Sequence, residues 1–301
     1  MNINFMRFRK IAISISLILF VSSIGSIFMR GLSLGLDFSG GTLVEIQYEE
    51  SVNLQEIRNV LSQNGYEDFQ VVNFGSDTDV LIKIADVEGN SSIGDEVFDL
   101  VQSNYPETEL KRIEFVGPQI GSELRDQGGF GMLVALGMIL LYVAFRFQYK
   151  FAVGAVDALA HDVVIILGVF SIFSWEFDLT DLAALLAVIG YSLNDTIVVS
   201  DRIRENFRKK RRSEATQLID RSLNQMLGRT LITSLTTLLV LFALLIFGGD
   251  AIQNFSLALI IGVLAGTYSS IYIVCNVLIS MNIIADDLAV KKVESYDDGM
   301  P

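Results

Sequence analysis

Six long apolar segments are the feature of this sequence that most constrains its fold. The first, residues 11–29, has no charged side chain and is long enough to cross the ~30 Å hydrocarbon core of a bilayer. The composition agrees, because 51% of the residues are hydrophobic, which is high for a soluble domain. The other five segments are residues 128–145, 151–174, 180–200, 229–248 and 255–282. The sequence therefore predicts an α-helical polytopic membrane protein with six transmembrane helices.

Basic residues precede the first apolar segment, at Arg7, Arg9 and Lys10. A signal peptide begins in the same way, with a charged region before an apolar one. No small-residue cleavage site stands out after the segment, and Arg30 follows it directly. We therefore expect residues 1–29 to be a short N-terminal stretch and a retained first helix.

Lysine and arginine alternate with acidic residues along the connections between segments, which predicts the orientation. Residues 201–228 hold eight basic side chains, whereas the connections 175–179 and 249–254 hold acids and no base. Further basic residues stand at alternate segment ends: Arg7, Arg9, Lys10, Arg146, Lys150, Lys291 and Lys292. We expect both termini, the basic loop 201–228 and the tail 283–301 to be cytoplasmic, with residues 30–127 on the opposite side.

The segment 30–127 is acidic, with 6 basic against 19 acidic residues. Alternating patterns predict strands at 43–48, 69–74, 79–85 and 109–116 and helices at 53–65 and 93–103. The order β-α-β-β-α-β predicts an inserted α+β ferredoxin-like domain. Its charge argues against binding of nucleic acid or anionic lipid. The acidic surface is either simply solvated or a docking face for an unfolded chain or a partner domain.

A glycine-rich stretch, GLDFSGGT, occupies residues 35–42 and includes Gly35, Asp37, Gly40 and Gly41. It leads into a predicted strand and no Gly-Lys-Ser/Thr follows, so we do not expect a nucleotide-binding loop. Glycines that allow sharp backbone turns at the junction of membrane and domain are the favoured interpretation. One cysteine and one histidine in the chain exclude a disulfide framework and a histidine-rich metal cluster, and we expect no cofactor.

Ionisable residues inside apolar segments are costly and need a reason. Asp195 lies in the fourth segment beside Asn194, and Arg229 opens the fifth segment, a turn before Thr233. Asp195 could be paired with Arg229 for packing alone, or it could be a proton carrier with Arg229 as a switchable partner. Because Arg229 begins its segment, a place at the lipid headgroups is its other interpretation.

The third and sixth segments also carry small or polar groups. Asp157 and His161 are four residues apart and share a helix face, with Asp162 rotated away. His161 and Asp162 serve either local hydrogen bonding or a proton route. Gly262 and Gly266 lie four apart, which favours close packing of helices rather than a transport role.

Several of these stretches together resemble SecF, the family of subunits of the bacterial SecD–SecF translocase accessory complex. The matching motifs run in order from the first segment to the sixth: GLDFSGGT (35–42), VGPQIG (116–121), HDVVIILGVFSI (161–172), IGYSLNDTIVVSDRIREN (189–206), RTLITSLTTLLV (229–240) and GTYSSIY (266–272). The fourth motif is highly specific. The resemblance implies half of a resistance-nodulation-division-type transporter, with SecD supplying the other half.

The same resemblance implies a function and partners. The family uses the proton-motive force to assist protein translocation across the cytoplasmic membrane beside the SecYEG channel, and it is not enzymatic. Its proton pathway falls here on Asp195 and Arg229, with Thr233 in the same polar stretch, and protons are the coupling ion. The implied partners are SecD, SecYEG, the translocating preprotein and membrane lipid, with YajC and YidC as further candidates.

Three other functions fit part of the pattern. A drug or lipid exporter of the same superfamily shares the six-helix unit, but such exporters usually join two halves in one long chain. An intramembrane aspartyl protease would use Asp162 and Asp195, but the glycine such enzymes place two residues before the Asp is missing at Asp195. A purely structural subunit with incidental charges is the third.

Overall fold

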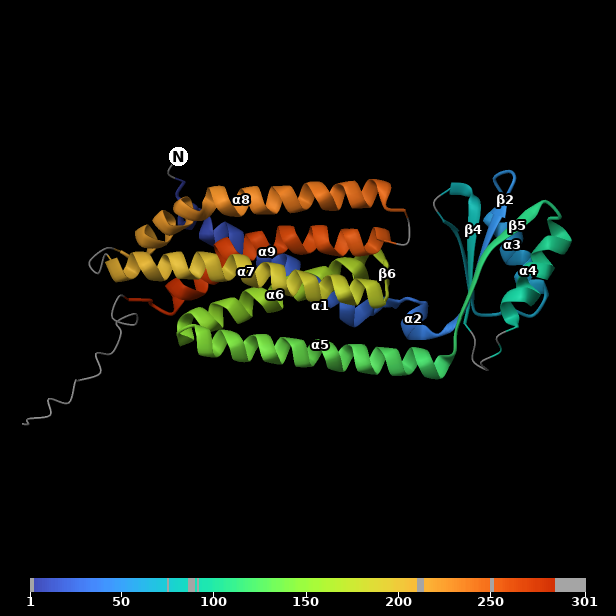
Figure 1. Ribbon diagram of the computed structural model, residues 1–301, viewed down its shortest axis with the longest axis horizontal. Coiled ribbons are helices and arrows are strands. Elements are labelled where there is room, and N and C mark those ends of the chain that lie inside the picture. The colour runs from blue at the N-terminus through green and yellow to red at the C-terminus, as the bar shows by residue number, and fades with distance from the viewer. Residues whose placement is uncertain are drawn as a thin grey trace, which may run out of the picture.

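The computed structural model describes residues 3–74, 76–85, 90, 92–209, 214–249 and 252–284 (Figure 1). Within these ranges six helices are long and apolar enough to cross a membrane, which confirms the predicted class. A short 3₁₀ turn, Phe5–Phe8, precedes the first of them. The six helices are α1 (Arg9–Arg30), α5 (Pro118–Arg146), α6 (Tyr149–Phe173), α7 (Leu179–Lys209), α8 (Ala215–Phe247) and α9 (Gln253–Ser280). The chain is thus a multi-pass membrane protein.

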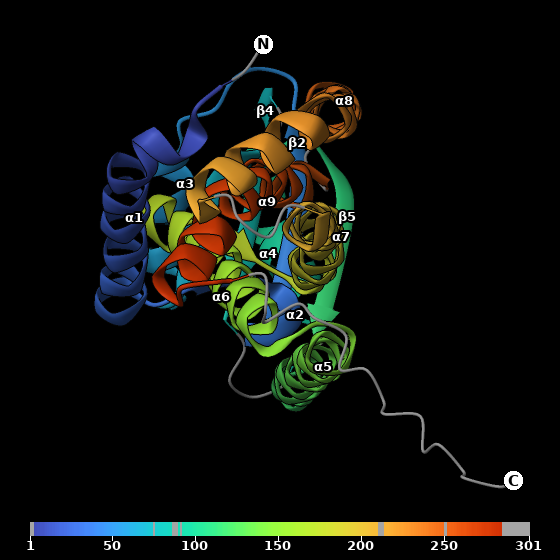
Figure 2. The ribbon, with the colours of Figure 1, turned by 90° about the vertical axis from the view of Figure 1, so that its left-hand side faces the viewer.

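The helices form an inner group and an outer group (Figure 2). About half of the most apolar window is buried in α6, α7 and α9, but 17% or less in α1, α5 and α8. The outer helices present large apolar side chains, such as Phe145 and Phe247, each 84% exposed. An apolar exposed surface of this kind is suited to lipid or to another membrane-spanning chain. Polar groups therefore concentrate where α6, α7 and α9 meet.

Glycines of α9 allow α7 to approach it closely. A Cβ atom at Gly266 would lie 2.8 Å from the Cβ of Ser192, and one at Gly262 would overlap the side chain of Val188. Small residues at helix interfaces permit such short backbone separations. The contact agrees with the packing interpretation of the two glycines and brings polar side chains of α7 and α9 together.

The outer domain contains all six elements that the sequence predicts. Its strands are β2 (Gly41–Tyr48), β3 (Phe69–Phe74), β4 (Ser76–Ile84) and β5 (Thr108–Val116), and its helices are α3 (Leu54–Gln63) and α4 (Ile93–Asn104). The sheet order is β3-β4-β2-β5, and every neighbouring pair is antiparallel. Fully buried residues including Val44, Ile82 and Leu61 form the core between sheet and helices. This topology is compatible with the expected ferredoxin-like sandwich.

The stretch 35–42 lies at the junction of domain and helices. Just before it, β1 (Ser33–Leu34) pairs in parallel with β6 (Glu176–Phe177), and the Gly35 N–H donates to Phe177 O at 2.9 Å. One helical turn, α2 (Leu36–Ser39), follows, and Asp37 Oδ2 accepts from the Leu179 N–H at 3.2 Å. The stretch thereby fastens the end of α1 to the start of α7.

Gly40 and Gly41 have φ angles of +71° and +126°, which L side chains rarely adopt. A Cβ atom at Gly40 would lie 2.9 Å from Pro118 Cα, and one at Gly41 would lie 2.5 Å from Ile84 O. Both positions therefore need glycine for backbone conformation and for close approach. A second link, an ion pair between Lys83 of β4 and Glu176 of β6, ties the sheet to the same junction.

Three helices extend beyond the predicted apolar segments. Helix α5 begins at Pro118, inside the range assigned to the domain, because Pro favours the first helical position and Gly117 takes an extended conformation before it. Most of the predicted loop 201–228 is helical, since α7 continues to Lys209 and α8 begins at Ala215. Asn206 stabilises these helical ends by donating to Ser222 Oγ and Gln225 Oε1. Basic residues 210–212, 291 and 292, and the tail from 285, lie outside the described residues.

Candidate functional site in the helical bundle

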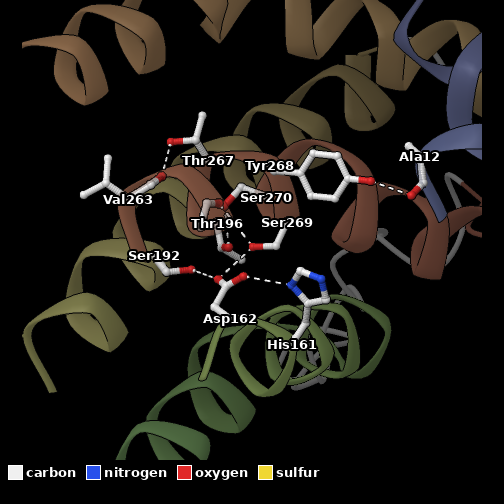
Figure 3. Close-up of polar contacts among 11 residues, drawn as sticks. Ala12, His161, Asp162, Ser192, Thr196, Val263, Thr267, Tyr268, Ser269 and Ser270 are labelled. Atoms are coloured by element: carbon white, nitrogen blue, oxygen red, sulfur yellow. Dashed lines mark hydrogen bonds and ion pairs between the residues drawn. The ribbon is translucent and has the colours of Figure 1, made fainter. Parts of the chain in front are cut away.

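Asp162 of α6 sits at the centre of a hydrogen-bonded network and is 1% exposed (Figure 3). Its Oδ2 accepts from Ser192 Oγ of α7 at 2.5 Å and from Ser269 Oγ of α9 at 2.8 Å. Its Oδ1 lies 3.0 Å from Nδ1 of His161. One carboxylate therefore binds side chains from all three inner helices.

His161 is held beside this carboxylate by two aromatic rings. Its centroid lies 6.3 Å from that of Phe20 on α1 and 6.4 Å from that of Tyr268 on α9. The imidazole is 6% exposed, and its Nε2 has no hydrogen-bond partner among the described residues. Nδ1 is thus the ring nitrogen that faces Asp162.

Hydroxyl pairs extend the polar contacts toward α8, and Figure 3 shows the first of them, Thr196 with Ser270. Thr196 and Ser270 share a hydrogen bond of 2.9 Å between α7 and α9. Further along α9, Thr267 shares one of 2.8 Å with Ser234 of α8, and Tyr191 donates to that serine at 3.4 Å. Such hydroxyls satisfy polar groups inside a membrane domain without adding charge.

Asp195 lies one residue before Thr196 on α7 and differs from Asp162 in its surroundings. It is 4% exposed, yet its Oδ2 is buried without a hydrogen-bond partner in the part of the chain that the structure describes. Burying such an oxygen without a partner costs about 1–3 kcal/mol, and more if the group is charged. The carboxylate is therefore in an unfavourable environment that a proton or a partner would relieve.

Arg229 is the basic residue that acts electrostatically on Asp195. It stands on α8 close enough to interact electrostatically with Asp195, but the two form no ion pair within 4.0 Å in the described residues. The guanidinium is on an exposed part of α8. In this conformation the two side chains are therefore not joined as an ion pair, and the roles expected for them stay predictions.

Thr233 and Asn194 contact neither of these charges directly. Thr233 Oγ1 donates to the carbonyl oxygen of Arg229, one turn back on its own helix, at 2.9 Å. Asn194 is exposed on α7, four residues after Gly190. A Cβ atom added at Gly190 would have no neighbour within 4 Å. The face of α7 that carries Gly190 and Asn194 is thus uncovered, next to the helix that carries Arg229.

Two polar contributions are not evident from the sequence. The first is Ser269, which donates to Asp162. In the sequence it follows Gly266 by three residues, so it looks like one more small residue at the α7–α9 contact. Asp181, fully buried at the start of α7, accepts from the Asp178 N–H at 3.0 Å. An acidic residue in the first turn of a helix is the signal that could have found it.

The two carboxylates have different partners. Asp162 is hydrogen-bonded to two serines and a histidine, and no hydrogen bond joins it to Asp195 within the described residues. No cluster of three or more His, Cys, Asp or Glu suited to a metal ion occurs in the described ranges. Fold and site together define a polytopic membrane protein with ionisable groups buried in its helical bundle, an arrangement typical of ion-coupled transporters.

Comparison with known proteins identifies the family. Residues 96–283 match the model for "Protein export membrane protein SecD/SecF, C-terminal", and residues 25–52 match the "SecD/SecF GG Motif". The chain is 51% identical to the protein translocase subunit SecF of Pseudomonas aeruginosa over 100% of this chain and 98% of the relative. It is 43% identical to SecF of Escherichia coli O157:H7 over 99% and 94%. The chain belongs to the SecD/SecF family and is of the SecF type.

Two solved structures share the fold. The crystal structure of SecDF from Thermus thermophilus, a translocon-associated membrane protein, matches 93% of this chain with a TM-score of 0.83 and 38% identity. A structure of SecDF in a super-membrane-facing form matches the same share with a TM-score of 0.70. This chain spans 39% of each SecDF chain.

Proposed function

We propose that this chain is the SecF subunit of a complex with SecD that uses the proton-motive force to assist protein translocation across the bacterial cytoplasmic membrane. Its similarity to SecF proteins over their whole length supports the assignment. Its coverage of 39% of a SecDF chain supports SecD as the supplier of the remaining part. SecYEG is the proposed channel and the preprotein the cargo, with YajC and YidC as further partners.

The orientation is part of the proposal. Arg7, Arg9 and Lys10 before α1, and Arg146 and Lys150 between α5 and α6, support cytoplasmic termini by the positive-inside rule. The domain between α1 and α5 is then periplasmic. Its sheet and two helices lie beyond one end of the long helices in Figure 1.

Asp195 is the proposed proton carrier, and the observation that carries this proposal is its buried, unpartnered Oδ2. A guanidinium in contact with a carboxylate favours the ionised form, whereas its withdrawal into the present arrangement favours the protonated form. Movement of Arg229 toward and away from Asp195 would load and release one proton. Protons are the only coupling ion in this scheme, and no cofactor takes part.

The uncovered face of α7 and α8 is the proposed contact with SecD. Gly190 and Asn194 of α7 leave room there for another helix, and a polar group from that helix would complete the site around Asp195. His161 and Asp162 take the structural role in this scheme, because the network satisfies Asp162 fully. The two SecDF structures, with TM-scores of 0.83 and 0.70, support more than one arrangement in the family.

The decisive experiment replaces Asp195 by Asn, which keeps the shape and removes the titrating proton. Inverted membrane vesicles that contain the variant with SecD should complete preprotein export no faster with a proton gradient than without one. Asp99→Asn is the matched control, because it removes the same carboxylate charge from an exposed position on α4 of the outer domain. Normal gradient-dependent export by a correctly assembled Asp195→Asn variant would refute the proposal.

A further inference from the structure

A second polar site lies in the outer domain and shares no residue with the site around Asp162 and Asp195. A groove of about 540 Å³ opens at the end of β2, where the connection to α3 meets the end of α4. That volume is in the range of pockets that bind small ligands or side-chain groups. The lining residues are Tyr48, Glu49, Glu50, Ser51, Val52, Asn53, Glu56, Asn104, Tyr105, Pro106 and Glu107.

The groove is strongly negative. Four of its lining residues are glutamates, at 49, 50, 56 and 107, and none of the described lining residues is basic. All four are exposed, so their charges face solvent, and within the described residues only Glu56 has a hydrogen-bond partner inside the domain, Tyr105. Their shared sign favours a cationic ligand and disfavours nucleic acid or an anionic headgroup.

Two tyrosines form the inner wall. Tyr48 is 6% exposed, and its hydroxyl is buried with no hydrogen-bond partner in the described residues. Burial raises the pKa of Tyr48 well above its ordinary range, so the hydroxyl stays neutral. An unpartnered buried hydroxyl is uncommon in native proteins, and a ligand in the groove could supply the missing hydrogen bond only after displacing the atoms that cover it.

Tyr105 links the aromatic wall to the acidic rim. Its ring packs edge-on against Tyr48 with centroids 5.6 Å apart. Its hydroxyl donates to Glu56 Oε2 at 3.2 Å, which positions both the ring and the carboxylate. Burial, with a smaller contribution from this hydrogen bond, raises the pKa of Tyr105.

Carboxylates beside aromatic rings suit an organic cation. A lysine ammonium or arginine guanidinium forms charge-assisted hydrogen bonds with carboxylates and is attracted to the face of an aromatic ring by cation–π interaction. A bare metal ion gains nothing from the rings, and the described residues hold no three-ligand cluster for one. The shape and charge therefore point to a basic side chain carried on a polypeptide.

We propose that this groove binds lysine or arginine side chains of an extended polypeptide as it emerges from the membrane. The proposal rests on the proposed role in translocation, which supplies unfolded chains on this side. Charge complementarity selects the basic segments of such a chain. The groove lies outside the helical bundle, so it acts on the cargo and not on the proton.

The test uses the full-length chain in lipid nanodiscs and a fluorescent, unstructured ten-residue peptide with three lysines. Fluorescence anisotropy should show binding of this peptide and not of the same peptide with three glutamines. The double variant Glu56→Gln/Glu107→Gln should weaken binding about tenfold or more, since charge-assisted hydrogen bonds are lost. Tyr48→Phe, which keeps the ring and removes only the hydroxyl, should weaken it less.

The matched control is Glu67→Gln/Glu109→Gln, which removes the same charge from acidic residues of the domain that do not line the groove. The proposal would be wrong if both double variants weakened peptide binding equally, or if the glutamine peptide bound as tightly as the lysine peptide. The circular dichroism spectrum of each variant must match that of the wild type. If the Glu56→Gln/Glu107→Gln variant does not fold, the effect of Tyr48→Phe on peptide binding tests the groove.

The outcome is separable from that of the proton proposal. Asp195→Asn should leave lysine-peptide binding unchanged, because the two sites share no residue. Binding that depends on the groove glutamates, together with gradient-dependent export by Asp195→Asn, would refute the proton carrier and support the groove. Loss of export in Asp195→Asn without any groove-dependent binding would refute the groove alone.

Discussion

Asp162 and Asp195 are two carboxylates in one helical bundle with opposite environments. Asp162 accepts hydrogen bonds from Ser192 and Ser269 and lies beside His161, so its oxygens are satisfied by three helices. Asp195 is nearly as buried, but one of its oxygens has no partner in the described part of the chain. Burial alone therefore does not distinguish these two carboxylates; the number of hydrogen bonds that each accepts does.

The difference has an energetic meaning. A fully bonded polar network rigidifies the helices that contribute to it, and breaking it leaves several unsatisfied groups at once. An incompletely bonded carboxylate makes folding less favourable, and the same deficit lets protonation or a moving partner change its state. We expect substitutions at the two positions to separate stability from activity.

The largest expected effect is on stability at Asp162. Asp162→Ala should lower the free energy of unfolding by about 3–5 kcal/mol, because it leaves buried donors of three helices without an acceptor. Asp195→Ala should change it by less than about 1 kcal/mol in either direction, since only a partly satisfied group is removed. Chemical unfolding in detergent, followed by circular dichroism, measures both. Equal destabilisation by the two substitutions would remove the distinction between them.

The next effect concerns the helix contact that supports the Asp162 network. Gly266→Ala should destabilise the protein by about 1–3 kcal/mol, because its Cβ would lie 2.8 Å from that of Ser192. Gly190→Ala on α7 is the matched control, with nothing within 4 Å of the added carbon. In the chain alone it should be neutral or slightly stabilising. A loss of co-purifying SecD in Gly190→Ala would show that the uncovered face is an interface.

A smaller change in the free energy of unfolding should show which of two neighbouring serines, Ser269 or Ser270, is coupled to Asp162. Ser269→Ala and Ser270→Ala should each cost about 1 kcal/mol, the typical net worth of one hydrogen bond. In double-mutant cycles with Asp162→Asn, Ser269→Ala should couple by about 0.5 kcal/mol or more, because the two side chains are in contact. Ser270, whose partner is Thr196, should be additive with Asp162. Coupling at both serines would mean that the network extends to Thr196 and, next to it, Asp195.

The smallest effect extends the comparison to a charge outside the membrane. Burial lowers the pKa of Lys83, only partly opposed by Asp178, although Lys83 is paired with Glu176. The folded-state pKa is thus below the unfolded one, so the charged lysine disfavours folding, and this cost fades as the pH rises through that range. The stability of the wild type relative to Lys83→Met should therefore rise from about pH 8 to about pH 11. A relative stability that falls over this range would contradict the lowered pKa.

Much of the fold could be predicted from the sequence because its signals are local. Apolar length identifies each spanning helix, and alternation identifies each strand of the outer domain. The ends of α5, α7 and α8 could not be predicted in this way. Polar and basic residues from 201 to 228 are typical of a loop, but hydrogen bonds between Asn206 and Ser222 stabilise helix there.

The candidate site was less predictable, because its character depends on contacts between distant residues. The sequence shows that Asp162 and Asp195 are costly, but only the packing of α6, α7 and α9 shows that one is satisfied and the other is not. From the sequence, Thr233 could either line a wet crevice or bond to its own helix. In the structure its hydroxyl donates to the Arg229 carbonyl of the same helix, a local bond that hydroxyl side chains can always make.

The joint between β5 and α5 has a mechanical consequence. One residue, Gly117, separates the last residue of the edge strand from Pro118, and α5 then runs for 29 residues, about 44 Å, without interruption. A helix resists stretching along its axis, so a pull on the outer domain travels down this rod with little loss. At its far end Arg146 pairs with Asp201, about 9 Å along α7 from Asp195. A pull on the outer domain is therefore expected to reach the end of α7 that follows Asp195.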